Sequence, residues 1–413
     1  GIFMKEKILI VNSGSSSLKF SLYEMPEKKE LINGNIEKIG LDDSFCTLKI
    51  NGEKMIHKYL VKDHVSATKV MLKELLDNKV INNLNEIRNV GHRILHGGEI
   101  YSSSVVIDDE VIENIKKLTK LGPLHHPAEL SVILTLKDII PNINNVAVFD
   151  TAFHQTMPVE NYLYATPYSW YENNGVRKYG FHGTSHKYIT GVMQEKLHKK
   201  DINIISCHLG SGASIACIKD GKCYDTSMGL TPLDGLVMGT RSGSIDPSII
   251  TYMMSETNKT AEEIINDLNK KSGLYGMCGK SDFRDVLNLI DQNDRRAKIA
   301  YTKFRNAVVR YIAEYYVELD GNVDAIVFTA GIGENVMNIR KSIIDKLSHP
   351  LHLELDEKEN ESIAKFKNKQ EGKITTDNSS IPVYVVPTDE EVMILNDTYD
   401  LTREKNKELC LVK

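Results

Sequence analysis

The sequence has 413 residues, 41% of them hydrophobic, and this length predicts two or three globular domains with ample cores. The 51 Lys and Arg residues are outnumbered by 56 Asp and Glu residues, and the net charge of −5 argues against a surface that neutralises nucleic-acid phosphates. No apolar stretch approaches the roughly 20 residues that span a bilayer, and the N-terminus lacks the pattern of a secretory signal. We therefore expect a cytoplasmic protein that binds neither nucleic acid nor membranes.

Short apolar runs alternate with helical patterns through most of the chain, which predicts a layered α/β fold. A strand over residues 8–12 runs into small residues and returns over 19–23, as in a hairpin. Apolar spacing predicts helix faces within 72–80 and 111–118 and a long packed helix over 301–319. Buried strands are expected at 146–150, 202–207 and 325–329.

One part of the sequence repeats the plan of another. Segment 204–218 has the same order as segment 8–22: an apolar strand, a polar residue, a Gly/Ser turn and a second strand. Two such hairpins predict a duplicated fold in which each half offers one glycine-serine turn to the same ligand. A domain boundary is expected near residues 151–160, after the strand that ends at Asp150.

Three glycine-containing segments are candidate phosphate sites, because backbone without Cβ bulk brings N–H groups against phosphate oxygens. The first is the turn at 13–17, where Lys19 adds positive charge, although an ordinary hairpin turn is the alternative. The second, at 208–214, repeats this turn and adds an imidazole. The third, at 331–335, lies between a buried strand and a helix, but Val336 replaces the last glycine of a dinucleotide fingerprint.

Several charged or polar side chains lie next to glycines or at the end of a buried strand, which a solvated surface residue does not require. Arg93 and Arg241 are flanked by glycines, and their planar guanidinium groups suit carboxylate or phosphoryl oxygens, with structural salt bridges as the alternative. Asp150 ends a buried strand and His182 lies in a glycine-flanked segment, but neither has zinc-site spacing. Asp389 and Glu390 either hold magnesium or form the acidic first turn of the last helix.

The chain resembles the acetate kinase family over nearly its whole length. The resemblance is carried, in order, by the strings VNSGSSSLKF, GHRILHGGE, PLHHP, VFDTAFHQTMP, RKYGFHGTSH, TSMGLTPLDGLVMGTRSGSIDP, NKKSGL, SDFRD and FTAGIGEN. It implies the fold of the acetate and sugar kinase, heat-shock chaperone and actin superfamily, with two α/β domains of duplicated ribonuclease H-like topology and an interdomain nucleotide cleft. The implied domains are residues 4–154, completed by a C-terminal helix at about 392–413, and a nucleotide-binding domain at 155–391. A homodimer is also implied.

The same resemblance implies roles for individual residues. The catalytic groups would be Arg93, Asp150, His182 and Arg241, of which the two arginines would also bind substrate. The remaining substrate contacts would come from Leu95, Leu124, His125, Phe181 and Pro232. The nucleotide would contact Ser15, Ser17, Lys19, His208, Leu209, Gly210, Ser211, Gly212, Asp282, Phe283, Arg284, Gly331, Ile332, Gly333, Glu334 and Asn335. Mg²⁺, or Mn²⁺ in its place, would be held by Asn12 and Glu390.

Two positions depart from the family pattern. Ser211 stands where the family usually has Asn, so a shorter side chain must reach the phosphate there. Asp389 replaces a frequent Asn beside the metal-binding glutamate. Neither departure removes a proposed catalytic group.

The implied reaction is reversible, Mg-dependent transfer of the γ-phosphoryl group of ATP to acetate by in-line displacement, giving acetyl phosphate and ADP. Acetate needs no general base, because a carboxylic acid is already ionised near pH 7. Asp150 is therefore expected to orient Arg93 or the metal shell, and catalysis to rest on positioning and charge neutralisation. Propionate kinase is the alternative acceptor class. The alternatives from other classes are a chaperone- or actin-like ATPase, which would leave both arginines without a purpose, and a phosphate-sensing binding protein.

Overall fold

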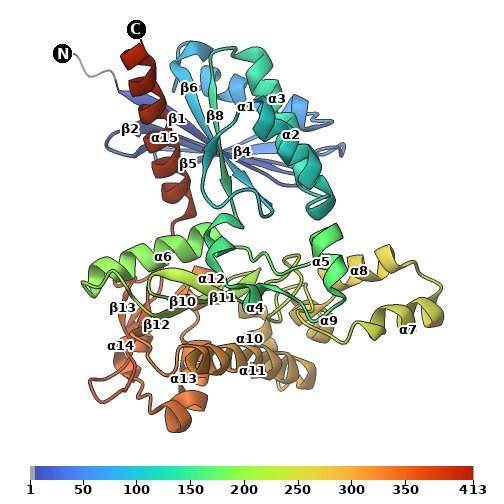
Figure 1. Ribbon diagram of the computed structural model, residues 1–413, viewed down its shortest axis with the longest axis vertical. Coiled ribbons are helices and arrows are strands. Elements are labelled where there is room, and N and C mark those ends of the chain that lie inside the picture. The colour runs from blue at the N-terminus through green and yellow to red at the C-terminus, as the bar shows by residue number, and fades with distance from the viewer. Residues whose placement is uncertain (1–4, 413) are drawn as a thin grey trace. The chain divides into compact units, whose positions relative to one another are not determined.

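The computed structural model describes residues 5–412, with side chains as far as residue 403, and it divides into two compact units. Unit 1 contains the chain up to Ala152 together with everything from Glu390 onward, and unit 2 is Phe153–Asp389. The chain therefore leaves unit 1 once and returns to it through its last helix (Figure 1). Among the described residues, no helix combines the length and the apolar character that crossing a bilayer requires.

Unit 1 is built on one mixed sheet with the strand order β5-β4-β3-β2-β1-β6-β8-β7. Its strands are β1 (Glu6–Ser13), β2 (Leu18–Met25), β3 (Lys29–Glu37), β4 (Phe45–Ile50), β5 (Glu53–Lys58), β6 (Ile87–Ile94), β7 (Val105–Val106) and β8 (Asn144–Phe149). Its helices are α1 (His64–Asp77), α2 (Asp109–Lys117), α3 (His126–Ile139) and α15 (Glu390–Val412).

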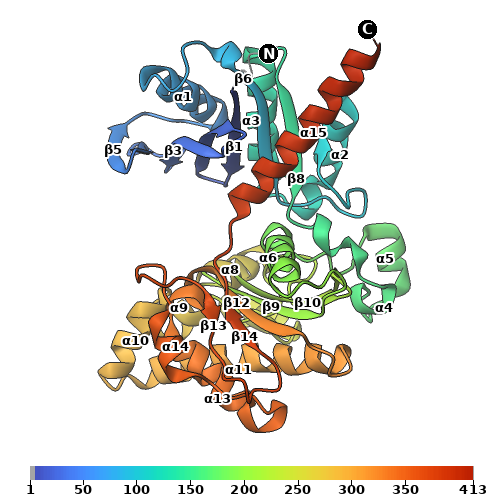
Figure 2. The ribbon, with the colours of Figure 1, turned by 90° about the vertical axis from the view of Figure 1, so that its left-hand side faces the viewer.

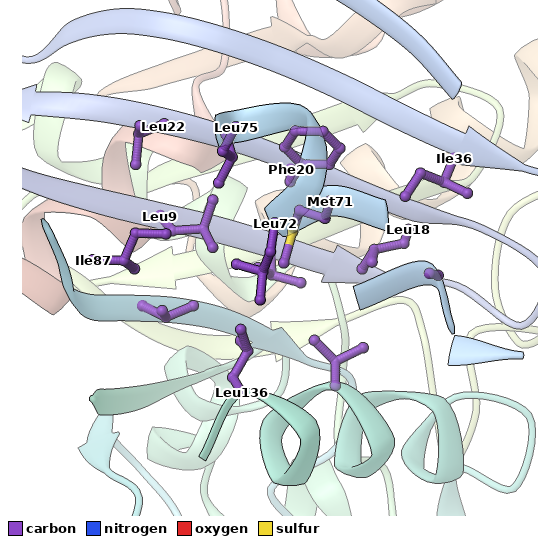
Figure 3. Close-up of a cluster of buried hydrophobic side chains, with 14 of the residues drawn as sticks. Leu9, Leu18, Phe20, Leu22, Ile36, Met71, Leu72, Leu75, Ile87 and Leu136 are labelled. Atoms are coloured by element: carbon purple, nitrogen blue, oxygen red, sulfur yellow. The ribbon is translucent and has the colours of Figure 1, made fainter. Parts of the chain in front are cut away.

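Helices cover both faces of the unit 1 sheet, because alternate residues of a strand face opposite sides. Leu9 of β1 belongs to a buried cluster that includes Leu75 of α1 and Leu136 of α3 (Figure 3). Its neighbour Ile8 belongs to a second cluster with Ile394 of α15. The near-continuous apolar run of β1 thus reflects burial on both faces.

The last helix packs closely along β6 (Figure 2). A Cβ at Gly91 of β6 would lie 2.3 Å from Thr398 Oγ1 and 2.8 Å from the Ile394 side chain of α15. Glycine is therefore required at position 91 for this close approach, and the helix holds the strand that carries Arg93.

Unit 2 has a sheet with the order β11-β10-β9-β12-β14-β13. Its strands are β9 (Ile204–Leu209), β10 (Ala213–Lys219), β11 (Lys222–Thr226), β12 (Ala325–Thr329), β13 (Gly372–Lys373) and β14 (Val383–Val385). Its helices are α4 (Val159–Tyr162), α5 (Tyr168–Asn174), α6 (Gly183–Lys196), α7 (Ser248–Thr257), α8 (Ala261–Lys270), α9 (Gly273–Cys278), α10 (Phe283–Asp291), α11 (Arg295–Glu318), α12 (Ala330–Asn335), α13 (Met337–Leu351) and α14 (Glu357–Ser362). Helix α6 covers one face of the sheet and α11 the other (Figures 1 and 2).

The two sheets share a five-stranded core. In unit 1 it is β3-β2-β1-β6-β8, and in unit 2 it is β11-β10-β9-β12-β14. In each core the first three strands in sequence form an antiparallel meander, and the last two run parallel to the first. This duplicated ribonuclease H-like topology confirms the predicted fold class. The repeated sequence plan at 8–22 and 204–218 corresponds to the equivalent hairpins β1–β2 and β9–β10.

The predicted strands and long helices are found, with differences at their ends. Val80 does not extend the first helix face, because α1 ends at Asp77, and Val80 packs on the core from the following segment. Leu118 lies in a short 3-10 turn after α2, and Leu319 follows α11 as its C-cap. The glycine turn expected at 331–335 is itself the short helix α12. Its first residue, Ala330, takes a positive φ of 67°.

Candidate functional site

In unit 1, polar side chains gather where β1 and β6 end and β2 begins. Asn12 of β1 lies opposite Lys19 of β2 on one side and opposite Arg93 of β6 on the other. Sheet register therefore makes neighbours of residues that are far apart in sequence. The pocket at this edge has a volume of about 190 Å³ and is lined by Asn12, Ser13, Gly14, Ser17, Lys19, Arg93, Leu95, His125 and Glu129.

Arg93 and Asp150 form a two-point ion pair. Arg93 Nε donates to Asp150 Oδ1 at 2.9 Å, and Nη2 donates to Oδ2 at 2.6 Å. Asp150 is only 2% exposed, whereas the Arg93 side chain is 29% exposed and reaches the pocket. The Asp150 charge raises the pKa of Arg93 above its ordinary value. Because both carboxylate oxygens of Asp150 accept hydrogen bonds from the guanidinium group, Asp150 can fix the orientation of Arg93.

The structure adds Glu129 to this pocket, which the sequence analysis missed. Glu129 of α3 is 3% exposed, and its carboxyl group accepts from the Leu95 backbone N–H at 3.2 and 3.3 Å. Burial raises the pKa of Glu129 to about 8. The available signal was its spacing, since Glu129 lies three and four residues before Val132 and Ile133 on the buried face of the helix.

His64 of α1, also missed, supports the first glycine-serine turn. Its Nε2 lies 2.8 Å from the Gly14 carbonyl and 3.1 Å from the Ser17 carbonyl, so it donates to this turn. A Cβ at Gly14 would lie 2.5 Å from Ser17 Oγ. The turn therefore keeps its shape through a glycine and a buried imidazole.

The other predicted residues of unit 1 have different surroundings. Ser15 is exposed in the turn, and Leu124 is 64% exposed; neither lines the described pocket. Glu390 is the first residue of α15, and its charge adds to that of Asp150 in raising the pKa of Arg93.

In unit 2, a pocket of about 890 Å³ brings together most of the predicted nucleotide segments. This volume lies in the range of small-molecule sites. Predicted residues that line it are Gly210, Ser211, Gly212, Arg241, Asp282, Phe283, Arg284, Gly331, Ile332 and Asn335. Residues that the sequence analysis missed are Gly239, Thr240, Ser281, Leu287, Val336, Met337, Asn338, Ile363, Ala364, Phe366 and Lys367.

This pocket follows from sheet topology. Strands β9 and β12 are parallel neighbours, so the segments after them leave the same edge of the sheet. A Cβ at Gly210 would lie 3.6 Å from the Cβ of Ala330, which places the two glycine segments in contact. Four predicted nucleotide residues of unit 2 do not line the pocket: the side chains of His208, Leu209 and Glu334 and the backbone of Gly333 are buried.

Gly212 lies beside the two predicted catalytic side chains of unit 2, Arg241 and His182. A Cβ on Gly212 would lie 3.3 Å from Arg241 Nη1 and 3.4 Å from His182 Nε2. Glycine at this turn therefore leaves room in front of both side chains. His182 caps the N-terminus of α6 with a positive φ of 57°, and its ring stacks on that of His208 with centroids 4.2 Å apart.

The segment that carries Arg241 is fixed by a second glycine. Gly273 has a φ of +60°, and a Cβ there would lie 2.1 Å from the Met238 carbonyl and 2.6 Å from the Arg241 carbonyl. The Gly239 N–H also donates to the Ser211 carbonyl at 3.0 Å. The NKKSGL string thus has a physical role, because its glycine allows the Arg241 segment to pack.

The predicted substrate residues of unit 2 are enclosed to different degrees. Phe181 is 1% exposed, and its carbonyl accepts from His154 Nε2 at 2.7 Å. Pro232 is half-buried. His154 had not been predicted; it is fully buried and holds the backbone one residue before His182.

Comparison with known proteins gives a consistent result. Residues 7–396 match the model of the acetokinase family. The acetate kinase of Finegoldia magna is 48% identical over 400 residues, which cover 96% of this chain and 100% of the relative. Among solved structures, the acetate kinase of Porphyromonas gingivalis has 41% identity and a TM-score of 0.89, covering 96% of this chain and 100% of that one. A propionate kinase from Francisella tularensis has 42% identity and a TM-score of 0.88 with the same coverage.

Proposed function

The chain belongs to the acetokinase family, and on this premise we propose that it catalyses the reversible transfer of the γ-phosphoryl group of ATP to acetate. It is a phosphotransferase whose acceptor is a carboxyl group, and the products are acetyl phosphate and ADP. The observation that carries the choice of acceptor is the unit 1 pocket. Two cationic side chains, Lys19 and Arg93, share it with the apolar side chain of Leu95, a combination suited to a short carboxylate.

On the acceptor side, Arg93 would bind the acetate carboxylate with the part of its guanidinium group that Asp150 leaves available. Asp150 supports this role because it fixes the orientation of Arg93 through two hydrogen bonds. Acetate is ionised near pH 7, so its oxygen attacks phosphorus without losing a proton. The main difficulty is repulsion between two anions, which positioned cations reduce.

On the nucleotide side, the large pocket of unit 2 would hold ATP, with its phosphates near the turn at Gly212. Arg241 and His182 flank this turn, and both would act on the phosphoryl oxygens as charge develops in the transition state. Positioned charge of this kind can raise phosphoryl-transfer rates by about 10³ to 10⁵. Ser211 lines the same pocket, so its hydroxyl remains available for a phosphate contact.

A divalent cation accompanies this type of transfer, and we propose that it is Mg²⁺, held by Asn12 and Glu390. An amide oxygen and a carboxylate are the hard donors that Mg²⁺ prefers, and Mn²⁺ accepts the same donors. Asn12 is the cross-strand neighbour of Arg93, and the Glu390 carboxylate raises the pKa of the same arginine. Both donors therefore act in the surroundings of Arg93, and the donor set fits a divalent cation. When bound, the ion would neutralise charge on the phosphate oxygens.

The test is to trap acyl phosphate with hydroxylamine in the presence of ATP, Mg²⁺ and acetate. We expect acetyl hydroxamate and ADP in equal amounts. Acetate-independent ATP hydrolysis without hydroxamate would instead favour the chaperone- or actin-like ATPase, and the absence of any turnover would favour a binding protein.

Propionate is a second candidate acceptor, favoured by the similarity to a solved propionate kinase. One methylene contributes roughly 1 to 3 kcal/mol to discrimination in an apolar pocket. We expect kcat/KM for acetate to exceed that for propionate by about tenfold or more. Equal values would contradict the acetate assignment.

We also propose that the protein forms a homodimer. Tyr168 and Trp170 of α5 are 56% and 50% exposed in the single chain, and large aromatic residues are enriched in protein interfaces. Light scattering coupled to size-exclusion chromatography is expected to give twice the chain mass.

A further inference from the structure

A chain of four hydrogen-bonding side chains runs from His182 into the interior of unit 2. His182 Nδ1 lies 2.8 Å from Ser214 Oγ of β10, and the same oxygen lies 2.8 Å from His186 Nε2 of α6. His186 Nδ1 then lies 2.9 Å from Ser206 Oγ of β9. His182 and His186 are four residues apart at the start of one helix, so both imidazoles reach the same hydroxyl.

The inner members of this chain are sealed from solvent. Ser206, Ser214 and His186 are each 0% exposed. Burial, with the nearby His154 and His208, lowers the pKa of His186 well below its ordinary value, so its imidazole is neutral. A neutral imidazole has one N–H and one acceptor nitrogen, and a serine hydroxyl donates one proton. Only a few arrangements of protons are therefore consistent with the three contacts.

The arrangements differ in how well they use the buried protons. In one, His182 donates from Nδ1 to Ser214, Ser214 donates to His186 Nε2, and His186 donates from Nδ1 to Ser206. The Ser206 hydroxyl proton then has no acceptor, because its side chain makes no other hydrogen bond among the described residues. A buried unpaired donor of this kind is costly.

The reversed arrangement gives an acceptor to the proton of each of the three buried members, Ser206, His186 and Ser214. Ser206 donates to His186 Nδ1, His186 donates from Nε2 to Ser214, and Ser214 donates to His182 Nδ1. His182 must then carry its proton on Nε2. That nitrogen is the one beside Gly212, near Arg241 Nη1.

We propose that Ser214, His186 and Ser206 form a positioning relay that holds the His182 imidazole in its Nε2–H tautomer, with the N–H directed toward the glycine turn. This inference deepens the proposed function, because the oriented N–H would donate to a phosphoryl oxygen. The left-handed backbone of His182 is consistent with a ring held by its surroundings, since non-glycine residues adopt this conformation mainly where structure compels it.

The tautomer can be read directly by NMR of histidine labelled with ¹⁵N, with the His182 signals assigned by their loss in a His182→Asn variant. In the wild-type protein at pH 7.5 we expect a protonated Nε2 and an unprotonated Nδ1 that accepts a hydrogen bond. A proton on Nδ1, or a doubly protonated ring, would overturn the relay. This readout does not depend on turnover, so it tests the relay separately from the proposed function, which the hydroxamate assay tests.

Variants supply a second test. Ser214→Ala removes the donor to His182 Nδ1, and we expect a mixed His182 tautomer and a kcat lower by about tenfold or more, with KM for ATP and acetate within about threefold. Ser206→Ala frees the His186 tautomer and is expected to have a smaller effect in the same direction.

The matched control is Thr190→Val. It removes a buried hydroxyl on α6 that donates to the His186 carbonyl at 2.7 Å and is not part of the relay. We expect this variant to keep the Nε2–H tautomer of His182, and its kcat to stay within about twofold of the wild-type value. An unchanged tautomer in Ser214→Ala, or an equal change in Thr190→Val, would contradict the relay.

Discussion

The Arg93–Asp150 pair allows a quantitative test of how this protein binds a carboxylate. Asp150→Asn keeps the side-chain shape but replaces one acceptor oxygen with an amide N–H₂, so one of the two bonds to the guanidinium, at 2.9 and 2.6 Å, is lost. Hydrogen bonds to charged groups contribute about 1.5 to 3 kcal/mol. We therefore expect kcat/KM for acetate to fall roughly 10- to 100-fold, mainly through a higher KM, because Arg93 loses its orientation.

Initial rates of hydroxamate formation over a range of acetate concentrations measure this effect, with ATP held at saturation. Asp324→Asn is a matched control, because both of its oxygens are also occupied, by Lys199 at 2.9 Å and the Asn203 N–H at 2.8 Å, and it lines neither pocket. We expect its acetate KM to equal that of wild type. An Asp150→Asn variant with unchanged KM and a kcat reduced by about 10³ or more would refute the positioning role and favour one in the chemical step.

Three further predictions follow from single contacts. Gly273→Ala places a Cβ 2.1 Å from a backbone carbonyl, at a residue with a left-handed backbone. We therefore expect a lower unfolding midpoint and a kcat lower by about tenfold or more. The control is Gly191→Ala in α6, where a Cβ meets nothing within 4 Å, and it should instead stabilise the protein by about 0.5 to 1 kcal/mol. Burial raises the pKa of Glu129 from 4.5 to about 8, so the folded protein binds more protons than the unfolded chain across this window. Its stability relative to Glu129→Gln should therefore fall as pH rises from 5.5 to 7.5 in urea titrations, by up to about 1.4 kcal/mol per pH unit, and parallel curves would contradict this pKa. Glu390→Gln should raise the Mg²⁺ concentration for half-maximal activity by about tenfold, whereas Glu391→Gln, whose carboxylate accepts from two hydroxyls of unit 1, should lower stability and leave the Mg²⁺ dependence unchanged.

Local sequence determined much of the fold. The apolar run of β12 was placed at its observed bounds, and the packed helix α11 was recognised from its three- and four-residue spacing. The duplicated plan was visible because the first two strands of each sheet are joined by the same kind of turn. Such features depend on neighbours within a few residues, which a pattern of side chains records directly.

Element ends and turns were less accessible, because they depend on competing local contacts. The segment expected as a glycine turn is the short helix α12, and the residue with a positive φ is not a glycine but Ala330, its first residue. Helix α1 ends at Asp77 although the apolar pattern continues, because Asn78 caps it and Lys79 takes a positive φ of 58°, which a helix does not continue. Val80 then packs on the same core without being helical.

The arrangement of the candidate site was decided by tertiary structure. Asn12, Lys19 and Arg93 become neighbours only through the register of three strands, and the relay from His182 to Ser206 exists only because α6 packs across β9 and β10. Sequence spacing fixes periodicity within one element, whereas the distance between two elements depends on which strands pair and which faces are buried. For this reason the motifs predicted many of the residues of the candidate site, whereas the supporting contacts of Glu129, His64 and Ser214 were found only in the folded chain.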